Sequence, residues 1–326
     1  MALSKEFAQA HIERWQGELN KPWYNHRRHW PGCLFHHTPL ENAISVLTSS
    51  KLFSRNDPAN PCPRDVAARE VNATRAHAHD SVRLYFRPKT PTQYNIEGIR
   101  KLGECKFGED THAPVLVMLI LDAQQILTLP GTQFCDRNMQ RGNAVPGDSE
   151  AYFAAIPFDK VYHEGPIGTD ETITSHRCAE VLAVSPLDLR QCLRAIWFRS
   201  EPERDTLLNL LGEHRSKWAE RCHVSDAIKV FEKRHSFVQD ISLSQQGVIF
   251  SLNTRSDGRG VKIDIQIFDS AGRPVAHFQH ADLAAAPTHG SWIYNHAFID
   301  GMYRVRVEIE GHLAYDAYIP LGSALF

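Results

Sequence analysis

The hydrophobic pattern of the 326-residue chain changes its period near residue 235. Before that point, segments with apolar residues at helical spacing, such as 4–20, are interspersed with short continuous apolar runs. After it, apolar and polar residues alternate, as in "YRVRVEI" (303–309), between Gly- and Asp-containing turns. The sequence therefore predicts an α+β chain, with a mixed α/β domain over 1–235 and an all-β, immunoglobulin-like antiparallel sandwich over 236–326.

Within the first part, periodicity and turn residues predict the individual elements. We expect helices over 4–20, 39–53, 64–80 and 202–222. We expect strands at 33–37, 81–86, 114–121, 160–164, 178–184 and 193–198. A loop rich in Pro, Asn and Asp is expected at 54–64.

Charge and composition exclude several classes of protein. The formal net charge of −2 gives no global attraction to phosphate backbones, so nucleic-acid binding would need a local basic patch. The longest apolar run, at 114–121, is too short to span a bilayer, and the N-terminus lacks the apolar stretch of a signal peptide. The seven cysteines form no CxxC pair, which favours free thiols in a reducing cytoplasm. We expect a cytoplasmic protein with no membrane partner.

One carboxylate interrupts a run that reads as a buried strand. In "TSHRCAEVLAVSP" (174–186), Glu180 lies among Ala, Val and Leu, and alternation puts it on the same side as Leu182 and Val184. Burying a carboxylate is costly unless a charged or hydrogen-bonding partner meets it. Glu180 therefore lies either at a sheet edge in water or in a site.

Common cofactor fingerprints are absent from the sequence. No GxGxxG, GxxxxGK[ST] or GxSxG motif occurs. The "HAHD" stretch at 77–80 puts its histidines on different faces of the expected helix, with no complementary Cys/His pair, so we expect no metal site. What remains is one carboxylate, several arginines, a strand-end histidine and aromatic residues.

These pieces, in this order, resemble the DarT-type ADP-ribosyltransferases, NAD-dependent toxins that modify thymidine in single-stranded DNA. "LFHHTPLENAISVLTSSKLFSR" (34–55) resembles the family's opening His-x-Thr strand, acid-Asn pair and following helix. "DSVRLYFRPKTP" (80–91) is similar to its "DYVPFYF-x-P-R-x-P" strand, and "FCDRNM" (134–139) to its "FTD-x-N/H-A" element. "HRCAEVLA" (176–183) resembles "RRQAEFLV". The fold implied is an ADP-ribosyltransferase-like mixed α/β domain with two packed sheets.

The resemblance implies roles for individual residues. Glu180 would be the catalytic glutamate, paired with Arg75 on the preceding helix, with Arg69 as the alternative. The cosubstrate would be NAD, held without a metal. Its predicted contacts are His36, Thr38, Asn42, Tyr85 and Phe86.

The acceptor and the partners follow from the same resemblance. Asn138, with Arg137 and Asp136, would contact the substrate. A basic patch is expected from Arg137, Arg141, Arg87 and Lys89. The expected partners are single-stranded DNA, with RNA as an alternative, and a macrodomain antitoxin of the DarG kind. A toxin or anti-phage effector is the implied role.

Two departures keep alternatives open. Lys51 stands where the family has glycine, and the sandwich at 236–326 has no counterpart in the family. The sandwich is expected to target or regulate the enzyme, or else to brace the helix at 202–222. The acceptor could be RNA or protein, and a catalytically degenerate binding module is the alternative from another functional class.

Overall fold

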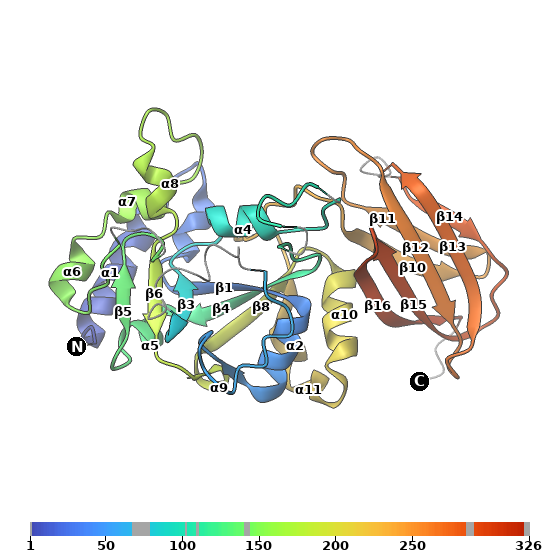
Figure 1. Cartoon of the computed structure of the whole chain (residues 1–326), viewed down its shortest axis with the longest axis horizontal. Helices are drawn as coiled ribbons and strands as arrows, with labels where there is room; N and C mark the ends of the chain where they lie inside the picture. The colour runs from blue at the N-terminus through green and yellow to red at the C-terminus, as the bar shows by residue number, and fades with distance from the viewer. Residues whose placement is uncertain are drawn as a thin grey trace. The chain divides into compact units, whose positions relative to one another are not determined.

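The structure, a computed structural model, describes residues 2–66, 79–101, 103–108, 111–139, 144–284 and 290–322. The chain groups into two compact units, whose elements Figure 1 labels. Unit 1 comprises Met1–Asn95, Val117–Trp197 and Asp226–Phe231. Unit 2 comprises Ile96–Leu116, Phe198–Ser225 and Glu232–Phe326. These are groups of contacts, and the division of the chain into domains after residue 235 stays a prediction.

Unit 1 mixes helices with a sheet. Its helices are α1 (Lys5–Glu18), 3-10 helix η1 (Asn25–His29), α2 (Leu40–Ser49), α4 (Pro91–Ile96), α5 (Ala123–Leu127), α6 (Glu150–Ala154), α7 (Phe158–Val161), α8 (Thr172–His176) and α9 (Leu189–Cys192). Its strands are β1 (Cys33–Pro39), β2 (Lys51–Leu52), β3 (Val82–Tyr85), β4 (Leu116–Asp122), β5 (Gln133–Cys135), β6 (Glu180–Ala183), β7 (Leu187–Asp188) and β8 (Leu193–Phe198).

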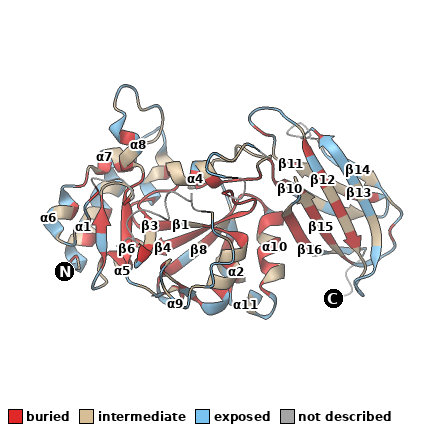
Figure 2. Ribbon diagram, in the orientation of Figure 1, coloured by how far each residue is buried: buried red, intermediate tan, exposed pale blue. Residues whose placement is uncertain are grey.

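The main sheet of unit 1 has the strand order β5-β6-β3-β1-β4-β8, and β2 and β7 pair separately. The continuous apolar run at 114–121 becomes β4, whose residues are buried from Leu116 to Leu121, as Figure 2 shows in red. Because side chains alternate between the two faces of a strand, burial of all six residues shows that both faces of β4 are covered; within the sheet, β4 pairs between β1 and β8. The mixed α/β class predicted for this part is confirmed.

The predicted strand at 160–164 is wrong. Residues Phe158–Val161 form helix α7, and the Tyr162 N–H donates to the Phe158 carbonyl at 2.9 Å. Phe158, Val161 and Tyr162 are each at most 2% exposed. Their i, i+3, i+4 spacing buries one face of a helical turn, and in so short a segment that spacing is hard to distinguish from strand alternation.

Two predicted helices end earlier than expected. The helix expected over 39–53 stops at Ser49, where Ser50 adopts a left-handed φ of 59° and β2 follows. The helix expected over 202–222 is α10 (Glu201–Leu210), which stops before Gly212 at φ 55°. From Gly212 onward the chain forms short helical turns: η3 (Gly212–His214), α11 (Arg215–Trp218) and η4 (Ala219–Arg221). Most of the helix expected over 64–80 lies outside the described residues.

Unit 2 contains α10 and the C-terminal strands. Two antiparallel sheets, β10-β11-β14 and β13-β12-β15-β16, confirm the predicted sandwich. Their strands are β10 (Val238–Ser244), β11 (Gly247–Leu252), β12 (Val261–Phe268), β13 (Pro274–Leu283), β14 (Trp292–Asn295), β15 (Gly301–Ile309) and β16 (His312–Leu321); β9 (Cys222–Val224) precedes them. Ile265 on β12 pairs with Val307 on β15, and both are fully buried in the core between the sheets.

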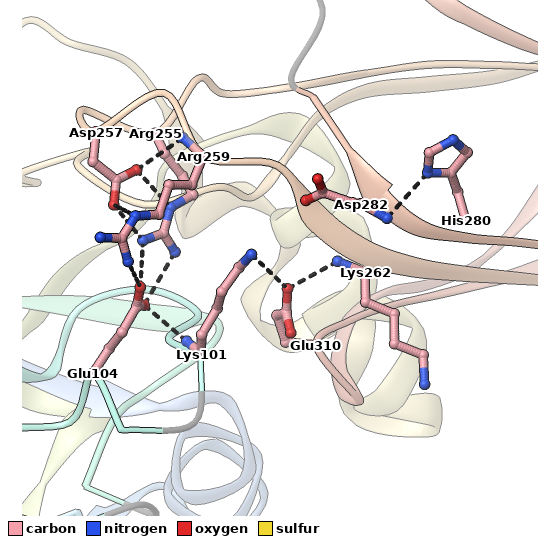
Figure 3. A network of polar contacts seen from close by, with 9 residues as sticks. All are labelled: Lys101, Glu104, Arg255, Asp257, Arg259, Lys262, His280, Asp282 and Glu310. Carbon is pink, nitrogen blue, oxygen red and sulfur yellow. Dashed lines mark hydrogen bonds and ion pairs between the residues drawn. The ribbon is translucent and has the colours of Figure 1, made fainter.

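Segments that precede the sandwich in sequence pack onto it within unit 2. On α10, Asn209 Nδ2 donates to the Asp316 carbonyl and Thr206 Oγ1 accepts from the Asp316 N–H, each at 3.0 Å. The segment from Ile96 to Leu116 is held by a polar network, shown in Figure 3. There, Arg255 Nη2 donates to Glu104 Oε1 at 2.8 Å, and the Arg255 side chain is only 3% exposed.

Among the described residues, no helix is long and apolar enough to cross a membrane. None of the seven cysteines forms a disulfide.

Candidate active site

Glu180 is the first residue of β6 and lies between two neighbouring strands. It pairs with Tyr85 of β3 on one side and with Cys135 of β5 on the other. Directly paired residues of antiparallel strands project from the same face of the sheet, so these three side chains share a face. Glu180 is 0% exposed, which excludes the sheet-edge alternative and leaves a carboxylate that needs partners.

Both oxygens of the Glu180 carboxylate have a donor. Arg83 Nη2 donates to Oε1, and the backbone N–H of Met139 donates to Oε2 at 3.1 Å. A carboxylate oxygen has two lone pairs, so each oxygen can still accept one further hydrogen bond. The carboxylate is therefore fixed in place and retains acceptor capacity for a ligand hydroxyl.

Arg83 is a residue of the candidate site that the sequence did not single out. It lies two positions before Tyr85 on β3, hence on the Glu180 face, and its side chain is 19% exposed. Nη2 also donates to Asn138 Oδ1 at 3.1 Å. Burial by itself lowers the pKa of Arg83, but the charge of Glu180, the proximity of Tyr85 and the hydrogen bond to Glu180 together outweigh it, so the pKa lies above its usual value. A cation in the strand facing Glu180 was the signal available in the sequence.

Two adjacent histidines of β1, His36 and His37, lie near Arg83 and Tyr85 but on opposite faces of the sheet. Phe35 pairs with Tyr85, so alternation puts His37 on the Tyr85 face and His36 on the other. The His37 ring stacks on Tyr85, with centroids 5.2 Å apart and planes 8° apart. His36 Nδ1 lies 3.1 Å from the Arg83 carbonyl.

The surroundings keep both imidazoles uncharged. Burial lowers the pKa of His36, with the Arg83 carbonyl opposing the shift. Burial, followed by the proximity of His36 and Arg83, lowers the pKa of His37 to about 3. Burial also raises the pKa of Tyr85, and the Glu180 charge adds to this, so its hydroxyl stays protonated and can donate.

The segment after β5 lies next to Glu180. Asn138 reaches the site through Arg83, and Asp136 forms an ion pair with Arg137 at 2.6 Å. His176 Nδ1 lies 2.8 Å from the Asp136 carbonyl, so this turn is fixed to the end of α8. The predicted substrate residues Asp136, Arg137 and Asn138 thus follow directly on the strand that pairs with Glu180.

Other predicted site residues are engaged elsewhere. Asn42 binds the main chain of Arg64 with both ends of its amide, at 2.7 and 2.9 Å. Thr38 is 5% exposed at the end of β1. Phe86 is 2% exposed and packs edge-on against Phe158 at 5.2 Å, within an aromatic core. The structure does not bring Asn42 or Phe86 together with Glu180.

Of the cationic residues predicted around the site, some lie outside the described residues and others are buried or paired. Arg75, its alternative Arg69, and Arg141 lie outside the described residues. Arg87 is 2% exposed, which removes it from a surface patch, and Lys89 Nζ lies 3.5 Å from Glu164. Across the described ranges, no group of three or more His, Cys, Asp or Glu side chains could hold a metal ion.

The arrangement suits stabilisation of positive charge. A carboxylate that is dehydrated and fixed by two donors needs no reorganisation when a cationic transition state forms beside it. Cleavage of a glycosidic bond passes through such an oxocarbenium-like state. Fold and site together are those of an α+β unit with a buried carboxylate suited to cleavage of a glycosidic bond, in a chain that also forms an antiparallel β-sandwich.

The family follows from a comparison with known proteins. The family model described as "ssDNA thymidine ADP-ribosyltransferase, DarT" matches residues 35–228, more than half of the 326 residues, and the chain belongs to this family. This confirms the resemblance and the enzyme class inferred from the sequence. No curated protein sequence matches the chain.

Solved structures of the family are similar to this chain at low identity. DarT from Thermus sp. 2.9 in complex with ADP-ribosylated ssDNA is 18% identical, with a TM-score of 0.49, over 62% of this chain and 96% of that one. The same protein with NAD+ is 19% identical, with a TM-score of 0.47, over 62% and 98%. DarTG from Thermosipho africanus in complex with ADP-ribose is 13% identical, with a TM-score of 0.41, over 65% and 53%.

Proposed function

We propose that the protein transfers ADP-ribose from NAD to a base of single-stranded nucleic acid, with thymidine in DNA as the acceptor that the family description favours. The observation that carries the proposal is Glu180, fully buried on β6 and held by Arg83 and the Met139 N–H. The bond that breaks joins nicotinamide to its ribose, and the bond that forms joins C1 of that ribose to the base. Nicotinamide leaves with the bonding electron pair, and the base loses a proton.

In this proposal Glu180 hydrogen-bonds a ribose hydroxyl and stabilises the positive charge that grows on the ribose. Tyr85 is the predicted NAD-binding residue whose position beside Glu180 supports such a role. His36 lies on the other face of the sheet, where its ring contacts the Arg83 carbonyl, and it stays a prediction. Thr38, Asn42 and Phe86 stay predictions for the same cosubstrate. Arg75 is proposed as the catalytic arginine, with Arg69 as the alternative.

Asn138, Arg137 and Asp136 are proposed to contact the acceptor strand, because Asn138 and Glu180 share the Arg83 guanidinium. The biological role that we infer is that of a toxin or anti-phage effector opposed by a macrodomain antitoxin. The sandwich of unit 2 is proposed to brace α10 and the segment from Ile96 to Leu116, with regulation or targeting of the enzyme as the alternative.

The test is transfer from labelled NAD to oligonucleotides by wild type and Glu180→Gln. Loss of a charge that acts only in the transition state should lower the rate at least about a hundredfold. Asp122→Asn is the matched control, since Asp122 forms an ion pair with Arg194 at 2.7 Å on the same sheet. A Glu180→Gln rate above about a tenth of wild type would exclude the catalytic role, because it corresponds to less than ~1.4 kcal/mol.

Three further substrates separate the alternatives. A DNA oligonucleotide without thymidine, an RNA of the same sequence and a protein mixture are offered in parallel. Transfer to thymidine-containing DNA alone supports the proposal, whereas label on RNA or protein assigns a different acceptor. NAD binding without transfer to any substrate would favour the degenerate binding module.

A further inference from the structure

Two aromatic side chains project into solvent between α1 and β1. Trp23 is 64% exposed and Tyr24 is 41% exposed. Trp30 and Trp218, at 0% and 1%, lie in the interior, and Trp292 is 36% exposed. An exposed indole contributes little to folding, so its position beside a second exposed ring calls for a functional reason.

The backbone and the neighbouring side chains hold the Tyr24 ring in a fixed orientation. Tyr24 adopts a left-handed φ of 55°, a conformation that is uncommon for an aromatic residue and that concentrates at functional sites. The Arg27 guanidinium lies over the Tyr24 ring, 5.4 Å from its centroid. A Cβ on Gly165 would lie 3.0 Å from Tyr24 Oη, so the glycine lets the ring approach the neighbouring loop.

The same segment is cationic. Residues 21–30, "KPWYNHRRHW", contain Lys21, Arg27 and Arg28 and no acidic residue. Arg28 donates from Nε to His29 Nε2 at 3.2 Å, and its Nη1 lies 3.5 Å from Asn20 Oδ1. Neither partner is anionic, so the charge of Arg28 remains available to a ligand. Burial, and then the Arg28 charge, lower the pKa of His29, as expected in positive surroundings.

A single loop connects this segment to the strand that carries Glu180. Arg27 Nη1 donates to the Tyr162 carbonyl at 3.0 Å. From the other side, Arg177 Nη2 donates to the Gly165 carbonyl at 2.6 Å and lies 2.7 Å from His163 Nδ1. Arg177 is three residues before Glu180, so the segment 21–30 and the start of β6 are anchored on the same loop.

We propose that residues 21–30 form a binding surface for single-stranded nucleic acid, in which bases stack on Trp23 and Tyr24 while Lys21 and Arg28 contact phosphates. Exposed aromatic rings interleaved with cations are the pattern by which proteins hold single strands without reading their sequence. The family match begins at residue 35, so this surface lies outside it. The proposal rests on the proposed function for the identity of the strand, and it moves the expected basic patch from Arg87 to the N-terminal segment.

The experiment measures binding of a fluorescein-labelled thymidine oligonucleotide by anisotropy, without NAD, over a range of salt concentrations. Trp23→Ala should weaken binding about fivefold or more at every salt concentration, because stacking on one base is lost. Arg28→Gln should reduce the slope of log K against log salt by about 0.7, the value for one phosphate contact of a single strand. Trp23→Phe, which keeps a ring, should retain most of the affinity.

Tyr318→Ala is the matched control, because Tyr318 is 50% exposed on β16 of unit 2. It should bind as wild type. The proposal is overturned if Trp23→Ala and Arg28→Gln bind within twofold of wild type with an unchanged slope. It is also overturned if a duplex of the same sequence binds as tightly as the single strand. A parallel assay measures binding to anionic phospholipid vesicles, and the proposal is overturned if Trp23→Ala weakens binding to the vesicles but not to the oligonucleotide.

Two further arms separate this proposal from the proposed function. An RNA oligonucleotide of the same sequence shows whether the surface binds both DNA and RNA. Weaker binding of either oligonucleotide by Trp23→Ala supports the proposed binding surface. Glu180→Gln should bind the oligonucleotide as wild type while losing transfer. Normal oligonucleotide binding by a wild type that transfers nothing would refute the proposed function and leave the surface intact.

Discussion

Arg83 fixes the position of Glu180 and is exposed on only a fifth of its own side chain. Removing one partner of a buried ion pair leaves an uncompensated charge, whereas replacing both partners by apolar side chains is often neutral. We therefore regard Arg83 as a positioning residue for the carboxylate, acting through Glu180 and Asn138.

This role predicts a specific pattern of stabilities. Arg83→Met should lower the free energy of unfolding by about 3 kcal/mol, and Arg83→Met with Glu180→Met should recover most of that loss. Arg194→Met is the control, because Arg194 also forms an ion pair, with Asp122, but its side chain is 48% exposed. This substitution should lower the free energy of unfolding by at most about 1 kcal/mol. Urea unfolding monitored by tryptophan fluorescence measures both. Equal losses in the single and double variants would contradict the ion-pair explanation.

His37 makes stability depend on pH. Its pKa in the folded protein is lowered to about 3 by burial, then by His36 and Arg83, from an ordinary value of 6.5. The unfolded chain therefore binds more protons than the folded chain between these two values. The contribution of the neutral His37 to the free energy of unfolding is fully present above pH 6.5, and it is lost as the pH falls toward 3.

His37→Phe preserves a ring against Tyr85 and removes the titration. Its unfolding free energy should lie close to that of wild type at pH 8. Between pH 6 and pH 4 it should fall less steeply, the difference in slope approaching about 1.4 kcal/mol per pH unit, the value for one proton. Urea unfolding at a series of pH values measures this, and parallel curves for the two proteins would show that His37 does not titrate as inferred.

At the scale of elements, the length of each segment's hydrophobic pattern decided whether its predicted secondary structure was correct. The long apolar run of β4 and the amphipathic α1 are predicted from the sequence because their patterns extend over two or more turns or several strand residues. The 160–164 segment is too short for its period to be determined, and burial of Phe158 and Tyr162 against neighbouring rings selects the helical turn α7.

Backbone breaks were the second source of error among the elements. Gly212, at φ 55°, is the first residue of η3, just after α10 ends, in a pattern that otherwise reads as one helix from 202 to 222. A single glycine inside a helical pattern costs about 1 kcal/mol relative to alanine, so the pattern alone does not show whether the helix stops there. The contacts of α10 with β16 show which part of that segment has a packing partner.

At the scale of the whole molecule, unit 2 bears on whether the sandwich is separable. Besides the strands, it includes α10 and the segment from Ile96 to Leu116. Glu97, which is 2% exposed, accepts hydrogen bonds from the Glu232 and Lys233 N–H groups at 2.9–3.1 Å. Ile99 belongs to the apolar core of the sandwich.

Truncation after residue 235 would remove the strands on which these segments pack. We expect the fragment 1–235 to be insoluble, or to melt many degrees below the full chain, because α10 and Ile99 would expose apolar surface. The structure thus favours the bracing role of the sandwich over a freely separable module. Differential scanning calorimetry of the fragment and the full chain measures this, and a soluble fragment with an unchanged melting temperature and transfer activity would establish the separable module instead.

The sequence by itself determined the fold class, the two-part pattern of periodicity and the family, and it singled out Glu180 as a candidate site residue. These depend on local patterns and on short motifs in a fixed order, which are present in the chain before it folds. The sequence did not determine that Glu180 is fully buried or what neutralises it, because Arg83 and Met139 are distant in the chain and meet it only through the register of β3, β6 and the turn after β5.

Tertiary structure also decided which face each side chain of β1 occupies. His36 and His37 are adjacent and chemically identical, but one-residue alternation puts only His37 on the Tyr85 face. It likewise assigned Phe86 to an aromatic core and left Trp23 in solvent, although both are large aromatic residues near Pro in the sequence. Hydrophobic character predicts that a ring is suited to burial, but whether it is buried depends on which neighbours the fold brings to it.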